Sequence, residues 1–211
     1  MADLKNLYNA VLNGDLKTAV AVTKEALAEG VDPLDLVSGQ MVPAMSEVGR
    51  RYECEEYFVP ELLLAARAMK GSLELIRPLL AARGDEPAGR VVIGTVKGDL
   101  HDIGKNLVAS LLEGGGFEVV DLGSDVAPEK FVQAVKDRNA NIVCLSALLT
   151  VTMPSMKTTM EALKSAGIRD RIKVMIGGAP VTQQYADEIG ADGYGENASV
   201  AVTLARRLVG I

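Results

Sequence analysis

The sequence is poor in the side chains that most often bind metals and flat ligands. Its 211 residues include one histidine, two cysteines and no tryptophan, and aromatic residues make up only 4%. A zinc site normally needs three or four protein ligands. One histidine and the separated Cys54 and Cys144 show no such set, although carboxylates could contribute. If His101 binds a metal, the metal most simply brings its remaining ligands with it, as in a macrocycle. A flat ligand would lie against aliphatic side chains and main chain rather than stacked rings.

The chain also lacks long apolar runs and an excess of positive charge. It has no run of about eighteen apolar residues and no signal-peptide start, so we expect a soluble cytoplasmic protein that does not enter a membrane. The two cysteines are not closely spaced, which suits a reducing compartment. The formal net charge of −6 argues against sequence-independent binding of nucleic acid.

The first part of the chain carries apolar residues at helical spacing. We predict helices at 4–12, 15–30, 34–48 and 59–80. Asp32-Pro33 is typical of a helix start, because aspartate caps the first N–H groups and proline fits the first turn. Short connections favour a helical bundle, and the composition of 83–89 is typical of a linker. We therefore predict a helical bundle (cap) domain at 1–85 and a second domain at 90–211, with a flexible joint between them.

From Arg90 onward, predicted strands alternate with predicted helices. The strands are expected at 91–96, 117–121, 141–146, 172–176 and 191–194. The helices are expected at 106–113, 129–138, 154–165, 182–189 and 198–208. This alternation predicts an α/β fold with a doubly wound parallel sheet and right-handed crossovers. The expected arrangement is flavodoxin-like (Rossmann-like), with five strands in the order 2-1-3-4-5.

The only histidine follows the first predicted strand, Val91–Val96, in a loop at the strand's carboxyl end, where open parallel sheets bind ligands. Asp99 lies two residues before His101 and can accept a proton from one ring nitrogen, which leaves the other nitrogen free for a metal. Gly98 and Gly104 let something bulky approach the main chain. The alternative is a histidine that caps a helix or fills a loop. The neighbouring carboxylate and the two glycines favour the interpretation of His101 as a metal ligand.

Three loops meet at one edge of the predicted sheet, because the first, third and fourth strands are neighbours in this order. They are Asp99–Gly104, Ser146–Thr152 and Gly177–Pro180. For the hydroxyls of the second loop, ordinary capping is the better explanation of any one taken alone, and Gly177-Gly178 alone could be a plain turn. Their convergence favours a binding site.

These residues resemble a known signature. Asp99-x-His101-x-x-Gly104, Ser146-x-Leu148 and Gly177-Gly178 resemble the motifs of cobalamin-binding domains that hold the cofactor base-off, with histidine on cobalt. The helical half resembles the cap of methionine synthase, where Tyr52 replaces a phenylalanine and Val59 a leucine that press on the upper corrin face. The whole chain is similar to the small, free-standing corrinoid proteins of methyltransferase systems.

The resemblance implies roles for individual residues. His101 would be the lower axial cobalt ligand, Asp99 would orient it, and Thr152 would extend the relay. Asn197-Ala198-Ser199 would close the base end of the channel for the nucleotide tail. The other residues that it places against cobalamin are Gly98, Leu100, Asp102, Ile103, Gly104, Ser146, Leu148, Thr150, Gly177 and Gly178.

The resemblance also implies a carrier that is not catalytic alone. A methyl group would ride on the cofactor, as methylcobalamin alternating with a cobalt(I) corrinoid. The expected partners are a substrate:corrinoid methyltransferase, a corrinoid:acceptor methyltransferase that delivers to a folate or a thiol, and a reductive activator.

Three alternatives share parts of this pattern. A radical isomerase subunit would need adenosylcobalamin and a separate barrel chain, and the cap with Tyr52 and Val59 favours methyl transfer instead. A cobalamin-based sensor usually carries an output domain, and no basic recognition helix is seen. A nucleotide- or flavin-binding domain predicts a phosphate-cradling loop, where Asp99 is a poor neighbour for phosphate.

Overall fold

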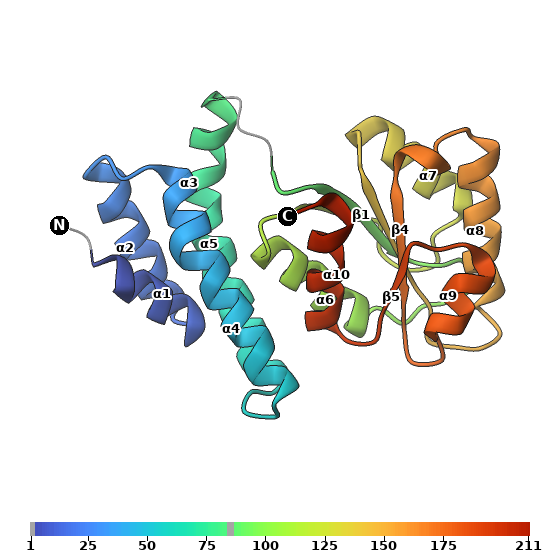
Figure 1. Cartoon of the computed structure of the whole chain (residues 1–211), viewed down its shortest axis with the longest axis horizontal. Helices are drawn as coiled ribbons and strands as arrows, with labels where there is room; N and C mark the ends of the chain where they lie inside the picture. The colour runs from blue at the N-terminus through green and yellow to red at the C-terminus, as the bar shows by residue number, and fades with distance from the viewer. Residues whose placement is uncertain (1–2, 84–86) are drawn as a thin grey trace. The chain divides into compact units, whose positions relative to one another are not determined.

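The computed structural model describes residues 3–83 and 87–211. The chain divides into two compact units, one of residues 1–87 with 113–116, and one of residues 88–112 with 117–211 (Figure 1). The predicted linker at 83–89 includes 84–86, which lie outside the described residues. Within the described parts, every helix is too short or too polar to cross a membrane.

The first unit is helical, as the sequence predicts. Its helices are α1 Leu4–Leu12, α2 Leu16–Ala28, α3 Pro33–Leu36, α4 Val42–Glu53 and α5 Val59–Arg83. Aspartates cap the first three, because the carboxylates of Asp3, Asp15 and Asp32 accept hydrogen bonds from N–H groups of the first turn. The predicted start at Asp32-Pro33 is confirmed.

The helix predicted at 34–48 is not a single α-helix. Between α3 and α4 the chain forms a π-helical segment, η1 Val37–Met41, and the N–H of Val42 donates to the carbonyl of Val37. Leu36 and Met41 are both fully buried although they are five residues apart. Five residues of α-helix would put them on different faces, whereas the wider turn directs both into the core.

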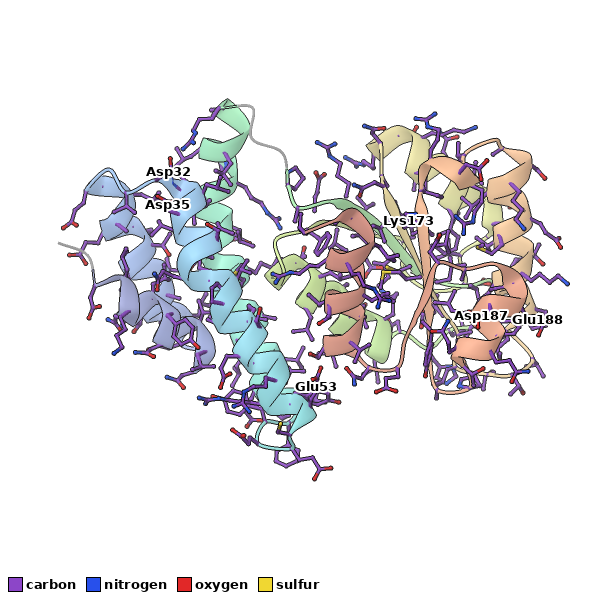
Figure 2. All side chains as sticks on the ribbon, in the orientation of Figure 1. Asp32, Asp35, Glu53, Lys173, Asp187 and Glu188 are labelled. Carbon is purple, nitrogen blue, oxygen red and sulfur yellow. The ribbon has the colours of Figure 1, made fainter. Side chains whose placement is uncertain are left out.

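The last helix of this unit is fixed to the third by an ion pair. Arg83 Nη1 donates to Asp32 Oδ2 over 2.7 Å, and Figure 2 shows Asp32 and Asp35 at the start of α3. Asp32 therefore caps α3 and binds the end of α5 at once. Helix α5 runs three residues past its predicted end at residue 80 and contains Pro78.

The second unit is the predicted parallel sheet with helices on both faces. Its strands are β1 Arg90–Thr95, β2 Glu118–Asp121, β3 Ile142–Ser146, β4 Lys173–Gly177 and β5 Gly193–Gly195. Its helices are α6 Ile103–Gly114, α7 Pro128–Arg138, α8 Pro154–Ser165, α9 Gln183–Ile189 and α10 Ala198–Val209, with a short 3-10 turn, η2 Arg169–Arg171. All strand pairs are parallel and the order is β2-β1-β3-β4-β5, so the predicted topology is confirmed.

Each face of the sheet has its own hydrophobic core. Val92, Val143 and Val174 pack toward α7, α8 and α9, whereas Val91 and Ile142 pack toward α6 and α10. Figure 1 shows α6 and α10 together on one side of the strands and α7, α8 and α9 on the other. A sheet buried on both faces explains why its strands are almost continuously apolar.

The strands end in register along the edge where the three predicted loops begin. Thr95 pairs with Ser146, Ser146 with Gly177, and Gly177 with Gly195. The register therefore brings the loops after β1, β3 and β4 to one place.

Candidate functional site

A buried carboxylate lies at the centre of this edge. The Asp99 side chain is fully buried. Its Oδ2 accepts hydrogen bonds from the N–H of Leu148 at 2.7 Å and from the hydroxyl of Thr152 at 2.7 Å. Its Oδ1 accepts from the N–H of His101 at 3.1 Å. One carboxylate thus connects the β1–α6 loop to the β3–α8 loop.

These donors keep Asp99 ionised. Burial alone would raise the pKa of the carboxyl, but the hydrogen bonds from Leu148, Thr152 and His101 outweigh it and hold the pKa well below its ordinary value of 3.8. An ionised carboxylate only accepts hydrogen bonds. Each group that faces Asp99 must therefore be a donor.

The ring of His101 is held by the same carboxylate. Nδ1 lies 3.0 Å from Asp99 Oδ1, so in the neutral ring the hydrogen lies on Nδ1 and the lone pair on Nε2. Among the described residues Nε2 has no hydrogen-bond partner, and the side chain is 53% exposed. The expected contact between Asp99 and His101 is therefore present, with a nitrogen lone pair available at the surface.

Two glycines allow the end of β4 to approach the neighbouring main chain on both sides closely. A Cβ at Gly178, which has φ +128, would lie 1.8 Å from the carbonyl oxygen of Ala147. A Cβ at Gly177 would lie 3.0 Å from the carbonyl oxygen of Gly195. Main-chain packing therefore requires positions 177 and 178 to be without side chains.

Exposed apolar side chains flank His101 in its own loop and occur again in the β3–α8 loop. Leu100 is 74% exposed, Ile103 is 86% exposed and Val151 is 80% exposed, and Leu148 and Leu149 are also exposed. A soluble surface rarely presents a set of large aliphatic residues without a ligand or a partner to cover them.

The described residues contain no cluster of three or more His, Cys, Asp and Glu that could hold a metal ion. Comparisons with known proteins show which family the chain belongs to. Two family models, each described as a B12 binding domain, match residues 89–203 and 3–77. Trimethylamine corrinoid protein 2 of Methanosarcina mazei is 47% identical over 196 residues, which cover 92% of this chain and 90% of that protein. The chain belongs to the B12-binding corrinoid proteins.

Solved structures agree with this assignment of the corrinoid protein. A cobalamin-binding protein from Desulfitobacterium hafniense DCB-2 has 34% sequence identity and a TM-score of 0.81, with 99% of each chain covered. A chain of the methanol:cobalamin methyltransferase complex from Methanosarcina barkeri has 32% identity and a TM-score of 0.85, with 98% of this chain and 79% of that chain covered. The cofactor of this corrinoid protein is a cobalamin.

The site of the corrinoid protein fits such a cofactor. A corrin supplies its own ring nitrogens to cobalt, so one protein ligand is enough, and the lone pair at His101 Nε2 can provide it. The exposed Leu100, Ile103 and Val151 suit the aliphatic surface of a corrin. The side-chain-free Gly177 and Gly178 suit a tail that passes along the sheet edge.

The remaining predicted cofactor residues are distributed as follows. Ser146 is partly buried at the end of β3, Thr150 is exposed in the turn after it, and Asp102 is partly buried. Gly98 has φ +86, and Gly104, in the first turn of α6, has open space around it. Ala198 is buried at the start of α10, behind the N-cap Asn197, whose side chain accepts from the N–H of Val200.

The two predicted cap residues belong to the helical unit. Tyr52 is partly buried in the last turn of α4, and Val59, at the first position of α5, is 40% exposed.

Sequence reasoning missed two residues that bond the main chain of His101 and Gly98. The hydroxyl of Thr95 donates to the carbonyl of His101 over 2.8 Å. Asp125, in the β2–α7 loop, accepts from the N–H of Gly98 over 2.8 Å. Thr95 was missed because it lies in a strand that reads as buried and structural, and Asp125 was missed because it belongs to no recognisable motif.

Proposed function

We propose that this corrinoid protein carries a methyl group on cobalamin between two methyltransferases, with the cofactor base-off and His101 Nε2 as the lower axial ligand. The observation that carries the proposal is the half-exposed ring, whose Nδ1 is bonded to a buried carboxylate while Nε2 has no partner among the described residues. When bound, the cofactor supplies a cobalt centre that accepts a methyl group in its reduced state and releases it again.

The residues around the ring would prepare it for this role. Asp99 fixes the tautomer that leaves the lone pair on Nε2. Whenever a proton is taken up at Nε2, the carboxylate balances the charge of the imidazolium. Thr152 holds the other oxygen of Asp99, so the carboxylate cannot turn away from the ring without losing that bond.

The two units would have different roles. We propose that residues 90–211 bind cobalamin and that residues 1–85 serve as a cap, with Tyr52 and Val59 against the upper corrin face. The remaining cobalamin contacts would come from the residues predicted above in the loops after β1, β3 and β4 and from Ala198. The exposed Leu100, Ile103 and Val151 would then be covered and would exclude water.

The partners are proposed from the relatives. The names of two similar proteins mention trimethylamine and a methanol:cobalamin methyltransferase, which support methyl carriage over an isomerase subunit or a sensor. Trimethylamine and methanol are the first donors to test, each with its methyltransferase. A reductive activator is the third partner that we propose, because the reduced state of the cofactor must be regenerated after accidental oxidation.

The axial ligand is tested by replacing the ring. The chain and its His101→Ala variant are loaded with hydroxocobalamin, and their absorption spectra are compared. The wild-type chain should show histidine-coordinated cobalt(III), and His101→Ala should lose that signature. Asp137→Asn serves as a control, because Asp137 is exposed on α7 and bonds only Gln133 among the described residues. An unchanged spectrum in His101→Ala would remove the axial assignment.

The carrier role has a separate test. The loaded and reduced chain is incubated with a methyl donor and its methyltransferase, and formation of methylcobalamin on the chain is followed by absorbance and mass spectrometry. Methylation should depend on both the donor and the methyltransferase. A chain that binds cobalamin but is not methylated with any donor and methyltransferase pair would argue for one of the other cobalamin functions.

A further inference from the structure

The main chain of residues 98–101 is hydrogen-bonded to two residues outside the loop that carries His101. We propose that Thr95 and Asp125 are positioning residues for the cobalamin site, which fix the main chain of residues 98–101 at its two ends. The inference rests on the proposed role of His101 as the metal ligand. Neither residue is bonded to the imidazole, so each acts through the main chain that bears it.

Asp125 holds the beginning of this segment with two hydrogen bonds. Its carboxylate accepts from the N–H of Gly98 over 2.8 Å, and its own N–H donates to the carbonyl of Asp99 over 2.9 Å. Its backbone has φ +53, a conformation that side chains other than asparagine, aspartate and glycine rarely adopt. The residue thus stays in a disfavoured conformation in which both of its hydrogen-bonding groups face the segment.

Thr95 holds the end of the segment from the last position of β1. Its side chain is fully buried, and its hydroxyl donates to the carbonyl of His101 over 2.8 Å. Its N–H donates to the carbonyl of Gly123 over 2.9 Å, which lies in the same β2–α7 loop as Asp125. The hydroxyl of Thr95 therefore connects the histidine loop to β1, and its N–H connects β1 to the β2–α7 loop.

These contacts decide where the ring can be. The bond between Asp99 Oδ1 and His101 Nδ1 requires the two residues to keep their relative position, and both are borne by the segment that Thr95 and Asp125 hold. Loosening either end would let the ring occupy other orientations before the cofactor binds. Such freedom weakens metal coordination even when the ligand itself is intact.

Two substitutions at Thr95 separate its hydrogen bond from its packing. Thr95→Val keeps the volume but removes the donor, whereas Thr95→Ser keeps the donor and removes a methyl group. Each full-length variant is loaded with hydroxocobalamin, and the histidine-coordinated fraction and the rate of cobalamin loss on dilution are measured. We expect about tenfold faster loss for Thr95→Val and a rate close to wild type for Thr95→Ser. The reverse order would mean that packing alone matters and would overturn the proposal.

Asp125 is tested by a matched series with its own control. Asp125→Asn keeps an acceptor for Gly98, and Asp125→Gly keeps the left-handed backbone but removes the acceptor. Asn139→Gly is the control, because Asn139 also has a positive φ, +48, and caps the other end of α7. In the cofactor-free chain, the Gly98 amide should exchange hydrogen faster in Asp125→Gly alone. The same variant should lose cobalamin about tenfold faster.

The outcomes separate this inference from the function on which it rests. If wild type shows no histidine coordination, both fail together. If wild type is coordinated but Thr95→Val and Asp125→Gly match it in coordination and in cobalamin loss, only the positioning role fails. Should Thr95→Val not fold, the exposed Asp125 decides the matter. Equal behaviour of Asp125→Gly and Asn139→Gly would then overturn the proposal.

Discussion

The carboxylate of Asp99 binds His101 twice, at the main-chain N–H over 3.1 Å and at ring Nδ1 over 3.0 Å, both through Oδ1. The two bonds fix the residue and its ring as one body. The other carboxylate oxygen is bonded to the loop after β3. A shift of that loop would therefore be transmitted to the imidazole.

Replacing Asp99 by asparagine should weaken coordination without removing it. The amide oxygen can still face Nδ1, but the charge is lost, and the amide group would oppose the donors Leu148 and Thr152. Loss of a partner that orients a metal-bound histidine typically costs 10–100-fold in affinity. We expect cobalamin loss from Asp99→Asn to be at least about tenfold faster, as measured by dilution and absorbance. A rate equal to that of the Asp137→Asn control would contradict the orienting role.

Thr152→Val should lower stability in a way that depends on pH. Because hydrogen bonds hold the pKa of Asp99 below 3.8, their stabilisation is present above about pH 3.8 and is lost as pH falls through the lowered pKa. A hydrogen bond to a charged group contributes roughly 1.5–3 kcal/mol, so Thr152→Val should melt several degrees lower at pH 7. The difference in melting temperature between wild type and Thr152→Val should become smaller in acid.

The alternative partner of the same hydroxyl makes this test decisive. Thr152 Oγ1 also lies 2.8 Å from the carbonyl of Leu149, which does not titrate. Melting temperatures of wild type and Thr152→Val are compared from pH 7 into acid as far as the carboxyl of Asp99 becomes protonated in the variant. A difference that stays constant through that protonation would show that the hydroxyl donates to Leu149 instead of Asp99.

Gly178→Ala should be strongly destabilising because the new Cβ would lie 1.8 Å from the carbonyl oxygen of Ala147. Main chain would have to move, in addition to the cost of a φ of +128 that only glycine tolerates well. We expect a loss above about 3 kcal/mol. Gly167→Ala is the control, since Gly167 has φ +68 but open space around it, and should cost only about 1–2 kcal/mol. Equal losses in denaturant unfolding would mean that the close approach is unimportant.

The two cysteines should react at very different rates. Burial raises the pKa of the Cys144 thiol to about 12, whereas Cys54 is exposed at the end of α4. Because the thiolate is the reactive form, an aromatic disulfide reagent at mildly alkaline pH should label one thiol quickly and the second only in denaturant. Cys54→Ser should remove the fast phase. Two fast thiols in the native chain would contradict the burial of Cys144.

The sheet could be predicted because each strand is bounded by loops and alternates with an amphipathic helix. The start of α6 could not. The sequence predicts a helix from Asn106, but α6 begins at Ile103. The prediction missed this first turn because it buries little apolar surface and Ile103 points to solvent. Apolar periodicity gives no signal at a helix end that faces away from the core.

Other contacts were hidden because they depend on the tertiary fold. Lys105 is buried and its ammonium is bonded to Asp121 at the end of β2, although lysine normally predicts an exposed position. The π-helical segment could have been indicated by the five-residue spacing between the apolar residues Leu36 and Met41. A search for apolar residues spaced by three and four does not detect it. The contact between Asp99 and His101 could be predicted from the sequence because the two residues are only two positions apart.

The ring of His101 is the only imidazole in the chain. Nitrogen-15 incorporated as histidine alone would therefore give magnetic resonance signals from this one side chain, with no assignment problem, once any affinity tag is removed. Tautomer, protonation and metal attachment could be followed on the intact protein as partners are added. This one side chain would therefore report on the nitrogen that is proposed to bind the cobalt on which the methyl group is carried.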